Sequence, residues 1–401
     1  MAPIAAGASI PTPGQWRSST RAATECGWDP ARHSKRLPCP NSPWRRPASG
    51  LRWTGNRPTP GAIDNRESAI DNPSVSGLPL VTSQAFESLE AEWAALHARV
   101  PRATPFLHPA WHAVWLRHFG GESAPVFLSI RGAEGLIGVG ALDAEREMAR
   151  ELGDHNVRDY AGPLALPGEE AAVAAGTLEW LREALTPAAT FWGLPANAPM
   201  TAAIEQAAAP GWTVERRHEA VCPGVDLDGD FEAYVAGLSK RDRHELRRKM
   251  RNLEAAGQAG FDSADTPDGI AAKLDRFFEL MRISRGDKDE FLTPAMEAFF
   301  RDLAATFSAL GMLRLSTLTL DGAEIAMTLA FEDEATVYLY NSGYDPAFAH
   351  LAAGLVSKAW AIRDACERGK RRFDFLRGEE EYKRRLGGVE REVVTLVLRS
   401  A

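Results

Sequence analysis

The sequence predicts an α/β protein, more closely α+β, with two similarly built domains behind an extension that has no core of its own. Three observations lead to this prediction. The chain of 401 residues is longer than one hydrophobic core usually accommodates. An order of hairpin, helix and strand occurs twice along it. Residues 1–77 hold 11 of the 26 prolines without apolar periodicity, which predicts a disordered Pro- and Arg-rich extension.

Composition and charge exclude several classes of protein. The chain is 45% hydrophobic and 25% charged, values typical of a soluble globular protein and not of a collagen or a coiled coil. Its net charge of −8 argues against nonspecific DNA binding over the whole surface. Four widely spaced cysteines indicate neither a disulfide framework nor a zinc site. No apolar run approaches a membrane span, and the N-terminus lacks a signal pattern, so we expect a cytoplasmic protein without a transmembrane segment.

The first domain is expected over residues 78–229. Apolar residues at helical spacing predict helices over 85–100 and 111–119, and an Ala-rich run predicts a third over 171–185. Short β-rich runs predict a hairpin of strands 126–130 and 136–141 and a further strand at 189–194.

The second domain is expected over residues 230–401, with a related order of elements. Strands 313–320 and 325–331 flank a Gly-containing turn, and a strand at 336–341 follows. A helix over 351–368 is expected to end at Gly369. The remaining predicted strands are 372–376 and 393–398. This repetition favours a duplicated α/β domain, although similarity between short turns can also arise by chance.

A long helix over Phe231–Gly257 is predicted to open the second domain. It has an apolar side, and seven of twelve positions from Lys240 to Arg251 are Lys or Arg. One interpretation is that Arg243 and Arg247 contact an anionic substrate, a phosphate-rich ligand or RNA. The alternative is a solvated helix whose arginines pair with the acidic surface around it.

Charged residues gather where the strand at 372–376 ends. Ligand clefts in open α/β sheets form at the carboxyl ends of strands. Acyl transfer needs a base for the nucleophile, donors for the oxyanion and a proton for the leaving group. Residues of the right types to supply these catalytic roles are Asp374, Glu379, Tyr382 and Lys383. Alternatively, Asp374 caps a turn and the Glu/Lys cluster is an exposed start of a helix. Tyr344 and Arg377 are further candidates for substrate contacts.

Other catalytic signatures are missing from the sequence. No serine stands in a nucleophile elbow, and neither a Walker loop nor a dinucleotide fingerprint occurs. His108, His112 and His118 do not have the spacing of a zinc motif, so no metal is expected.

Several of these segments together resemble a known family. The chain is similar to the CelD-like acetyltransferase domain of the GNAT superfamily, over roughly residues 80–400. The resemblance is carried in order by Arg243-His244-Glu245-Leu246-Arg247-Arg248, Gly343-Tyr344-Asp345-Pro346, Asp374-Phe375-Leu376-Arg377-Gly378-Glu379 and Tyr382-Lys383.

This resemblance has implications for fold and cofactor. CelD-like proteins are associated with cellulose and exopolysaccharide biosynthesis, and they resemble the Fem-type aminoacyl transferases, which have two GNAT-like folds in tandem. The superfamily binds acyl-CoA through backbone amides before a helix. By position, this cofactor-binding segment contains His350, Ala352, Ala353, Gly354 and Leu355. The superfamily's spaced glycines are reduced here to Gly354.

The implied function is transfer of an acetyl group from acetyl-CoA to an amine or hydroxyl, with a sugar or exopolysaccharide precursor as the acceptor. Asp374 or Glu379 would act as the base, backbone amides would polarise the thioester, and Tyr382 would protonate the thiolate. One alternative uses aminoacyl-tRNA as the donor, bound by the basic helix. Another is a non-catalytic regulator of polysaccharide synthesis.

Overall fold

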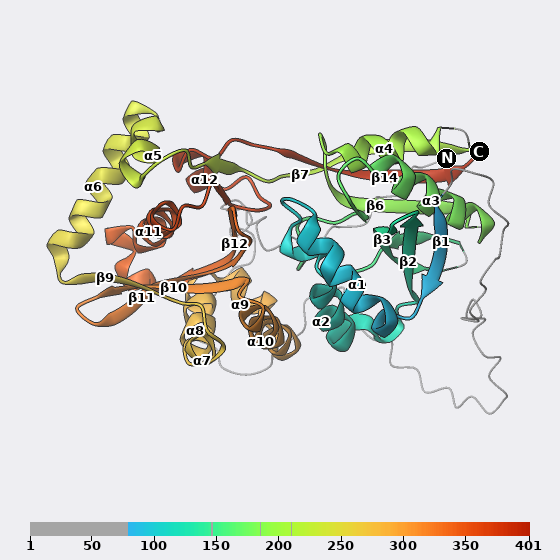
Figure 1. Cartoon of the computed structure of the whole chain (residues 1–401). Helices are drawn as coiled ribbons and strands as arrows, with labels where there is room; N and C mark the ends of the chain where they lie inside the picture. The colour runs from blue at the N-terminus through green and yellow to red at the C-terminus, as the bar shows by residue number, and fades with distance from the viewer. Residues whose placement is uncertain (1–78, 146, 185, 210) are drawn as a thin grey trace, which may run out of the picture. The chain divides into compact units, whose positions relative to one another are not determined.

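The computed structural model describes residues 79–145, 147–184, 186–209 and 211–401, in two mixed sheets with helices on both faces (Figure 1). The predicted disorder of residues 1–77 lies outside these residues. The mixed α/β fold predicted from the sequence is confirmed.

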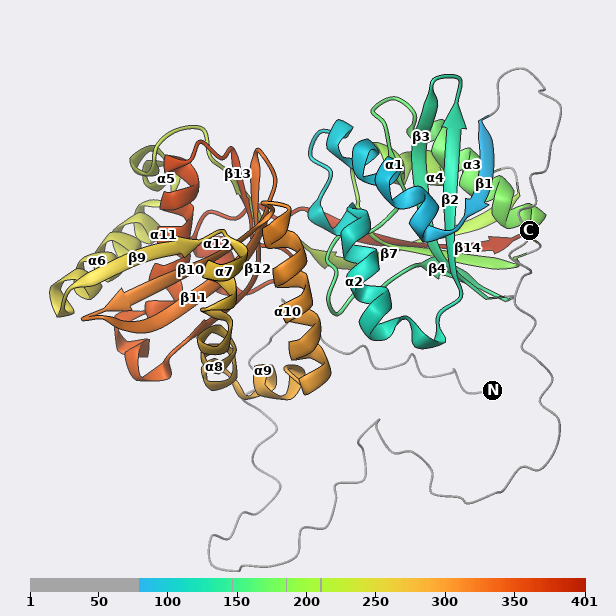
Figure 2. The ribbon, with the colours of Figure 1, turned by 60° about the horizontal axis from the view of Figure 1, so that its bottom comes forward.

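The first sheet has the strand order β1-β2-β3-β4-β6-β14-β7, and β5 pairs with β3. Figure 2 shows α1 in front of β2 and β3, with α3 and α4 behind. The elements are β1 Leu80–Gln84, α1 Phe86–Arg99, α2 Pro109–Phe119, β2 Pro125–Gly132, β3 Gly135–Ala144, β4 Ala149–Glu151, β5 Leu164–Ala165, α3 Glu170–Glu183, β6 Ala188–Pro195, α4 Pro199–Ala208, β7 Trp212–Val221 and β14 Glu392–Ser400.

The second sheet has the order β8-β13-β12-β11-β10-β9. In Figure 1, α5, α6 and α11 lie on one face of this sheet and α8 and α10 on the other. The elements are β8 Gly224–Asp226, α5 Phe231–Gly237, α6 Lys240–Ala256, β9 Ala259–Ala264, α7 Pro267–Ala271, α8 Leu274–Ser284, α9 Gly286–Phe291, α10 Pro294–Ala309, β10 Leu313–Leu320, β11 Ala323–Glu332, β12 Thr336–Tyr344, α11 Ala353–Glu367, β13 Arg372–Asp374 and α12 Glu381–Arg385.

The two sheets contain the same strand–helix–strand unit. In the first sheet β4 leads through α3 to β6, which is parallel to β4. In the second sheet β12 leads through α11 to β13, which is parallel to β12. The other strand pairs in both sheets are antiparallel. The predicted repetition of hairpin, helix and strand is therefore confirmed at the level of topology.

The last strand crosses back to the first sheet. β14 lies between β6 and β7, antiparallel to both, although its residues follow the whole second sheet in sequence (Figure 1). Its apolar residues Val394, Leu396 and Leu398 are buried in the core on the α3 and α4 side. The predicted boundary between residues 229 and 230 divides the chain once, whereas the chain returns to the first sheet at β14.

An aromatic core joins residues of the first half of the chain, before residue 230, to residues of the second half, from residue 230 onward. Trp111 of α2 packs edge-on against Phe331 of β11 and Phe307 of α10, with ring centroids 5.3 and 5.9 Å apart. Its ring also contacts Tyr340 of β12 at 5.8 Å. Such contacts bury large apolar areas in tilted or edge-to-face geometry. They hold the helices of the first half against the sheet of the second.

The predicted single helix over Phe231–Gly257 is wrong. The chain forms two helices, because Leu238 and Ser239 are extended and Ser239 caps α6 by accepting a hydrogen bond from the Asp242 N–H at 3.1 Å. A serine three residues before Asp242 resembles a capping box, in which this later position is usually Glu or Gln. The predicted apolar side is nevertheless buried, including Leu246, Met250 and Leu253.

Two further element boundaries also differ from prediction. The helix expected from Leu351 begins at Ala353, after a 3-10 turn over Pro346–Leu351. The strand expected over 372–376 ends at Asp374 because Leu376 adopts a left-handed backbone with φ of 55°. Both differences lie at the candidate functional site.

Candidate functional site

A cavity of about 330 Å³ opens where β12 and β13 separate. The two strands pair in parallel from Thr336 with Arg372 to Tyr338 with Asp374. Beyond this point β12 continues to Tyr344, whereas the segment that follows β13 turns away at Leu376. The cavity is lined by Asp159, Ser284, Arg285, Lys288, Leu339, Tyr340, Asn341, Ser342, Tyr344, Ala349, Ala352, Ala353, Gly354, Leu355, Lys358, Phe375, Leu376, Arg377, Glu380, Tyr382 and Lys383.

Two charged side chains shape the wall after β13. The Asp374 carboxylate accepts a hydrogen bond from the Leu376 N–H at 2.8 Å. The buried Lys383 ammonium donates to the carbonyl oxygens of Leu376 and Arg377 at 3.0 and 2.7 Å. It also forms an ion pair with Glu380 at 3.0 Å. These contacts hold the turned backbone, so both residues support the cavity wall structurally.

The opposite wall includes the N-terminus of α11. Ala352 precedes this helix in the left-handed conformation, with φ of 56°. Gly354 lies close to the Tyr344 ring, since an added Cβ would come within 3.0 Å of it. The first N–H groups of a helix have no intrahelical acceptor and carry partial positive charge. No acidic residue stands in the first turn of α11. This end of the cavity therefore favours an anionic group.

The lining contains more cations than anions. Its basic residues are Arg285, Lys288, Lys358, Arg377 and Lys383, and its acidic residues are Asp159 and Glu380. The Lys288 ammonium donates to Asn341 Oδ1 at 2.9 Å and to the Ser342 carbonyl. Lys358 donates to the Gly354 carbonyl at 2.9 Å and lies over the Tyr382 ring. Desolvation lowers the pKa of Lys358 to about 8.

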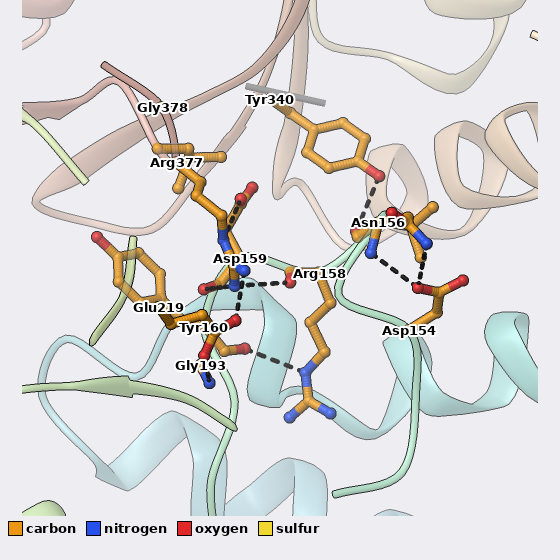
Figure 3. Close-up of polar contacts among 12 residues, drawn as sticks. Asp154, Asn156, Arg158, Asp159, Tyr160, Gly193, Glu219, Tyr340, Arg377 and Gly378 are labelled. Atoms are coloured by element: carbon orange, nitrogen blue, oxygen red, sulfur yellow. Dashed lines mark hydrogen bonds and ion pairs between the residues drawn. The ribbon is translucent and has the colours of Figure 1, made fainter. Parts of the chain in front are cut away.

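The first half of the chain contributes Asp159 to the cavity, and Figure 3 shows this residue beside Arg377. Arg377 donates to the Asp159 carbonyl at 2.9 Å and lies 3.3 Å from its carboxylate. The same guanidinium pairs with Glu219 at 2.5 Å. Desolvation raises the pKa of the Asp159 carboxyl, and the Arg377 charge opposes this shift. The buried Arg377 side chain, from the second half of the chain, thus holds the Asp159 carboxylate of the first half at the cavity.

The loop that carries Asp159 is fixed by hydrogen bonds. The Tyr340 hydroxyl donates to the Val157 carbonyl, at 2.9 Å. Arg158 donates to the carbonyls of Tyr160 and Leu152, at 3.1 and 2.7 Å. At the start of the loop, Asp154 accepts from the backbone and side chain of Asn156. The position of Asp159 is therefore set by a rigid loop.

Eight of the thirteen candidate site residues lie together in this cavity: Tyr344, Ala352, Ala353, Gly354, Leu355, Arg377, Tyr382 and Lys383. Tyr382 is half-buried, and desolvation raises the pKa of its hydroxyl well above its usual value. Within the described part of the chain, this hydroxyl makes no hydrogen bond, so it is available to a ligand.

The other five candidates do not line the cavity. Asp374 lies behind its wall and is bound by the Tyr160 hydroxyl at 3.1 Å and by Arg372 at 3.3 Å. Burial raises the pKa of Asp374. Glu379 and His350 are exposed. Arg243 and Arg247 lie on α6, where they bond to the Ala236 carbonyl and to Glu232.

Sequence reasoning missed several lining residues. Lys358 carried a signal, because it lies three residues after Leu355 and four before Ile362, on the buried side of α11. No sequence pattern indicates Asp159 as a site residue, because its place in the cavity depends on contacts with residues more than 200 positions away. No group of three or more His, Cys, Asp or Glu residues that could hold a metal occurs among the described residues.

Comparisons with known proteins identify the fold. Residues 240–384 match the family model described as acetyltransferase (GNAT) domain. The structure titled FemX is similar at a TM-score of 0.58 and 12% identity, covering 79% of this chain and 96% of that one. A conserved protein of unknown function from Bacteroides thetaiotaomicron has a TM-score of 0.55 and 14% identity, over 80% of this chain and 100% of its own.

A third similar structure is the C-terminal domain of a putative lysylphosphatidylglycerol synthetase from Agrobacterium fabrum. Its TM-score is 0.51 at 11% identity, over 78% of this chain and 92% of that one. No curated protein sequence matches the chain. Among the described helices, none is long and apolar enough to cross a membrane. The fold of the chain is therefore similar to these structures over most of its length, and its residues 240–384 are similar to an acetyltransferase (GNAT) domain.

Proposed function

We propose that the protein transfers an acyl group, in the simplest case acetyl, from acyl-CoA to an amine or hydroxyl. The observation that supports this proposal most directly is the cavity between the separating strands β12 and β13, with the N-terminus of α11 in its wall. A helix N-terminus binds phosphate through its unpaired N–H groups and its dipole. The excess of cationic side chains in the lining suits the same anionic ligand.

The cavity also offers groups for acid–base chemistry. Asp159 and Glu380 are the carboxylates in its lining, so we assign the base to Asp159 in place of Asp374 and Glu379. A raised pKa makes a carboxylate a stronger base at neutral pH. The Tyr382 hydroxyl, protonated at neutral pH, would donate the proton to the departing thiolate. Backbone N–H groups would polarise the thioester carbonyl.

The acceptor is proposed from the resemblance to CelD-like proteins. It is an amine or hydroxyl of a sugar, in the setting of cellulose or exopolysaccharide synthesis in the cytoplasm. This proposal predicts that thiol release from acetyl-CoA accelerates when an amino sugar or a nucleotide-activated sugar is added.

A second candidate is a Fem-like transferase that takes its acyl group from aminoacyl-tRNA. The fold similarity to FemX and the exposed basic residues of α6 favour it. Against it, Arg247 pairs with Glu232, and both Arg248 and Lys249 pair with Glu245, so part of the positive charge has internal partners. This candidate predicts tRNA binding that weakens steeply with salt and is lost when Arg243, Arg247 and Arg248 become Ser.

Calorimetric titration with acetyl-CoA tests the leading proposal. The Leu355→Trp substitution places bulk in the cavity lining, and Leu310→Trp adds the same side chain at an exposed position. Acetyl-CoA should bind the wild type and Leu310→Trp alike, and Leu355→Trp at least about tenfold more weakly, a change of 1.4 kcal/mol. Absence of binding to the wild type at about millimolar ligand, where affinity is already very weak, would rule out the acyl-CoA donor.

A further inference from the structure

Lys358 is a buried cation in the cavity. Its side chain lies on α11 with 6% of the residue exposed, and it belongs to the cavity lining. Of its three N–H donors, one bonds to the Gly354 carbonyl at 2.9 Å. The ammonium also lies 4.9 Å from the centroid of the Tyr382 ring. Neither partner carries a negative charge.

No ion pair joins Lys358 to a carboxylate within the residues that the structure describes. The charged groups that act on it are Glu380, which favours its ammonium form, and Lys383, which disfavours it. The positive N-terminus of α11 lies in the same wall. A buried cation without a counter-ion costs free energy, and a bound anion would remove this cost.

The position of Lys358 in the sequence supports a role beyond packing. It lies on the same side of α11 as the partly buried Leu355 and the fully buried Ile362, at spacings of three and four residues. An apolar residue at this position would complete that side without burying a charge. The cation therefore points to a ligand that carries or develops negative charge beside Tyr382.

We propose that Lys358 is a catalytic residue that stabilises the thiolate leaving group of the acyl donor, next to Tyr382. This inference rests on the proposed function. As the acceptor nitrogen or oxygen bonds to the thioester carbonyl carbon, the C–S bond breaks and its electron pair stays on sulfur. The Lys358 ammonium holds this negative charge, and the Tyr382 hydroxyl gives the sulfur its proton. The acceptor's proton passes to Asp159, and solvent reprotonates Tyr382.

The product complex provides a direct test that needs no acceptor. Free CoA carries an alkyl thiol that is mostly protonated at about pH 8. If Lys358 stabilises the thiolate, it lowers the pKa of the bound thiol, so bound CoA should show a stronger ultraviolet absorbance band of the thiolate at this pH than free CoA does. Subtracting the spectrum of the complex with desulfo-CoA, which lacks the thiol, isolates this band. Calorimetry on the same samples measures whether each ligand binds.

Three variants sharpen the test. Lys358→Met should still bind desulfo-CoA but lose at least about tenfold of the thiolate fraction, the effect of one pKa unit. Lys358→Arg, which keeps the charge, should retain the band. Lys370→Met is the matched control, because Lys370 is a mostly buried lysine outside the cavity lining, and it should retain the band as well.

The outcomes separate this inference from the proposed function. If neither CoA nor desulfo-CoA binds the wild type, the acyl-CoA donor is wrong and the inference falls with it. If both bind but the wild type shows no thiolate band, or Lys358→Met shows the same band as the wild type, the role of Lys358 is wrong and the donor proposal stands. Loss of the band in Lys370→Met would also overturn a specific role for Lys358.

Discussion

His108 links the stability of the first half to pH. Its Nδ1 atom accepts a hydrogen bond from the Ala110 N–H and caps α2. Burial, and secondarily the neighbouring His97, lowers the pKa of His108 from 6.5 to about 4. The unfolded chain takes up the proton near pH 6.5, whereas the folded protein does so only near pH 4. The stabilising contribution of the neutral ring is therefore complete above pH 6.5 and lost as pH falls toward 4.

We predict that His108→Asn reduces the acid sensitivity of folding. Asparagine can still cap α2 but does not titrate. The fall in the free energy of unfolding between about pH 7 and pH 4 should be smaller by about 3 kcal/mol in the variant, from the lowered pKa. Urea unfolding over this pH range measures it. An unchanged pH dependence would contradict the assigned burial of this histidine.

Arg377 binds two carboxylates from the other half. It is 2% exposed and pairs with Asp159 and Glu219. Arg377→Met leaves both acidic groups without their counter-ion, which we predict to lower the free energy of unfolding by about 3–5 kcal/mol. Arg399→Met removes an exposed arginine and should change it by less than about 0.5 kcal/mol. Denaturant unfolding of both variants checks this, and equal effects would contradict the buried network.

The candidate site could be predicted from the sequence only where its residues are local to a motif. Tyr382 and Lys383 follow a strand end closely, so their place in the cavity could be read from the chain. The sequence makes Asp374 a candidate for the base, but the early turn at Leu376 leaves its carboxylate behind the wall. Asp159 could not be found in this way, because Arg377 binds it across a long sequence separation.

At the scale of elements, the break between α5 and α6 rests on one side chain. Ser239 accepts the hydrogen bond of the Asp242 N–H, which is otherwise unsatisfied at the start of α6. We predict that Ser239→Ala lowers the free energy of unfolding by about 1 kcal/mol, the usual cost of losing a helix cap.

Ser239→Asp offers the matched comparison for this cap. Aspartate caps helices as well as serine does and carries a charge that the helix dipole favours. Thermal unfolding should therefore place Ser239→Asp at or near the wild type and Ser239→Ala below it. If the two variants are equally destabilised, the cap is not what separates the helices. Apolar periodicity alone missed the break, because Leu238, which lies in it, is buried like the apolar residues of the two helices.

At the scale of the whole molecule, the C-terminal strand completes the first sheet. β14 lies between β6 and β7, with Leu396 fully buried. We predict that a chain ending at Arg391 loses amide protection in β6 and β7, because both strands lose their shared partner. Removal of residues 1–77, which the sequence predicts to have no core of their own, should leave that protection unchanged. Hydrogen exchange of both shortened chains measures it, and a protected first sheet without β14 would contradict the topology.

The arrangement of the two sheets could be predicted only in part. Each strand–helix–strand unit follows from local patterns, which is why the repetition was visible in the sequence. The pairing of β14 with β6 and β7 is a choice among distant strands, which local patterns do not encode. The aromatic contacts of Trp111 with Phe307 and Phe331 are likewise long-range.

Acetyl-CoA is expected to bind between β12 and β13. Hydrogen exchange with and without saturating acetyl-CoA tests it most directly, because it reports each segment separately. We predict slower exchange over residues 339–344, 352–358 and 375–383, which form the two walls of the cavity. Unchanged exchange in these segments, or protection confined to residues 240–251 of α6, would contradict the claim.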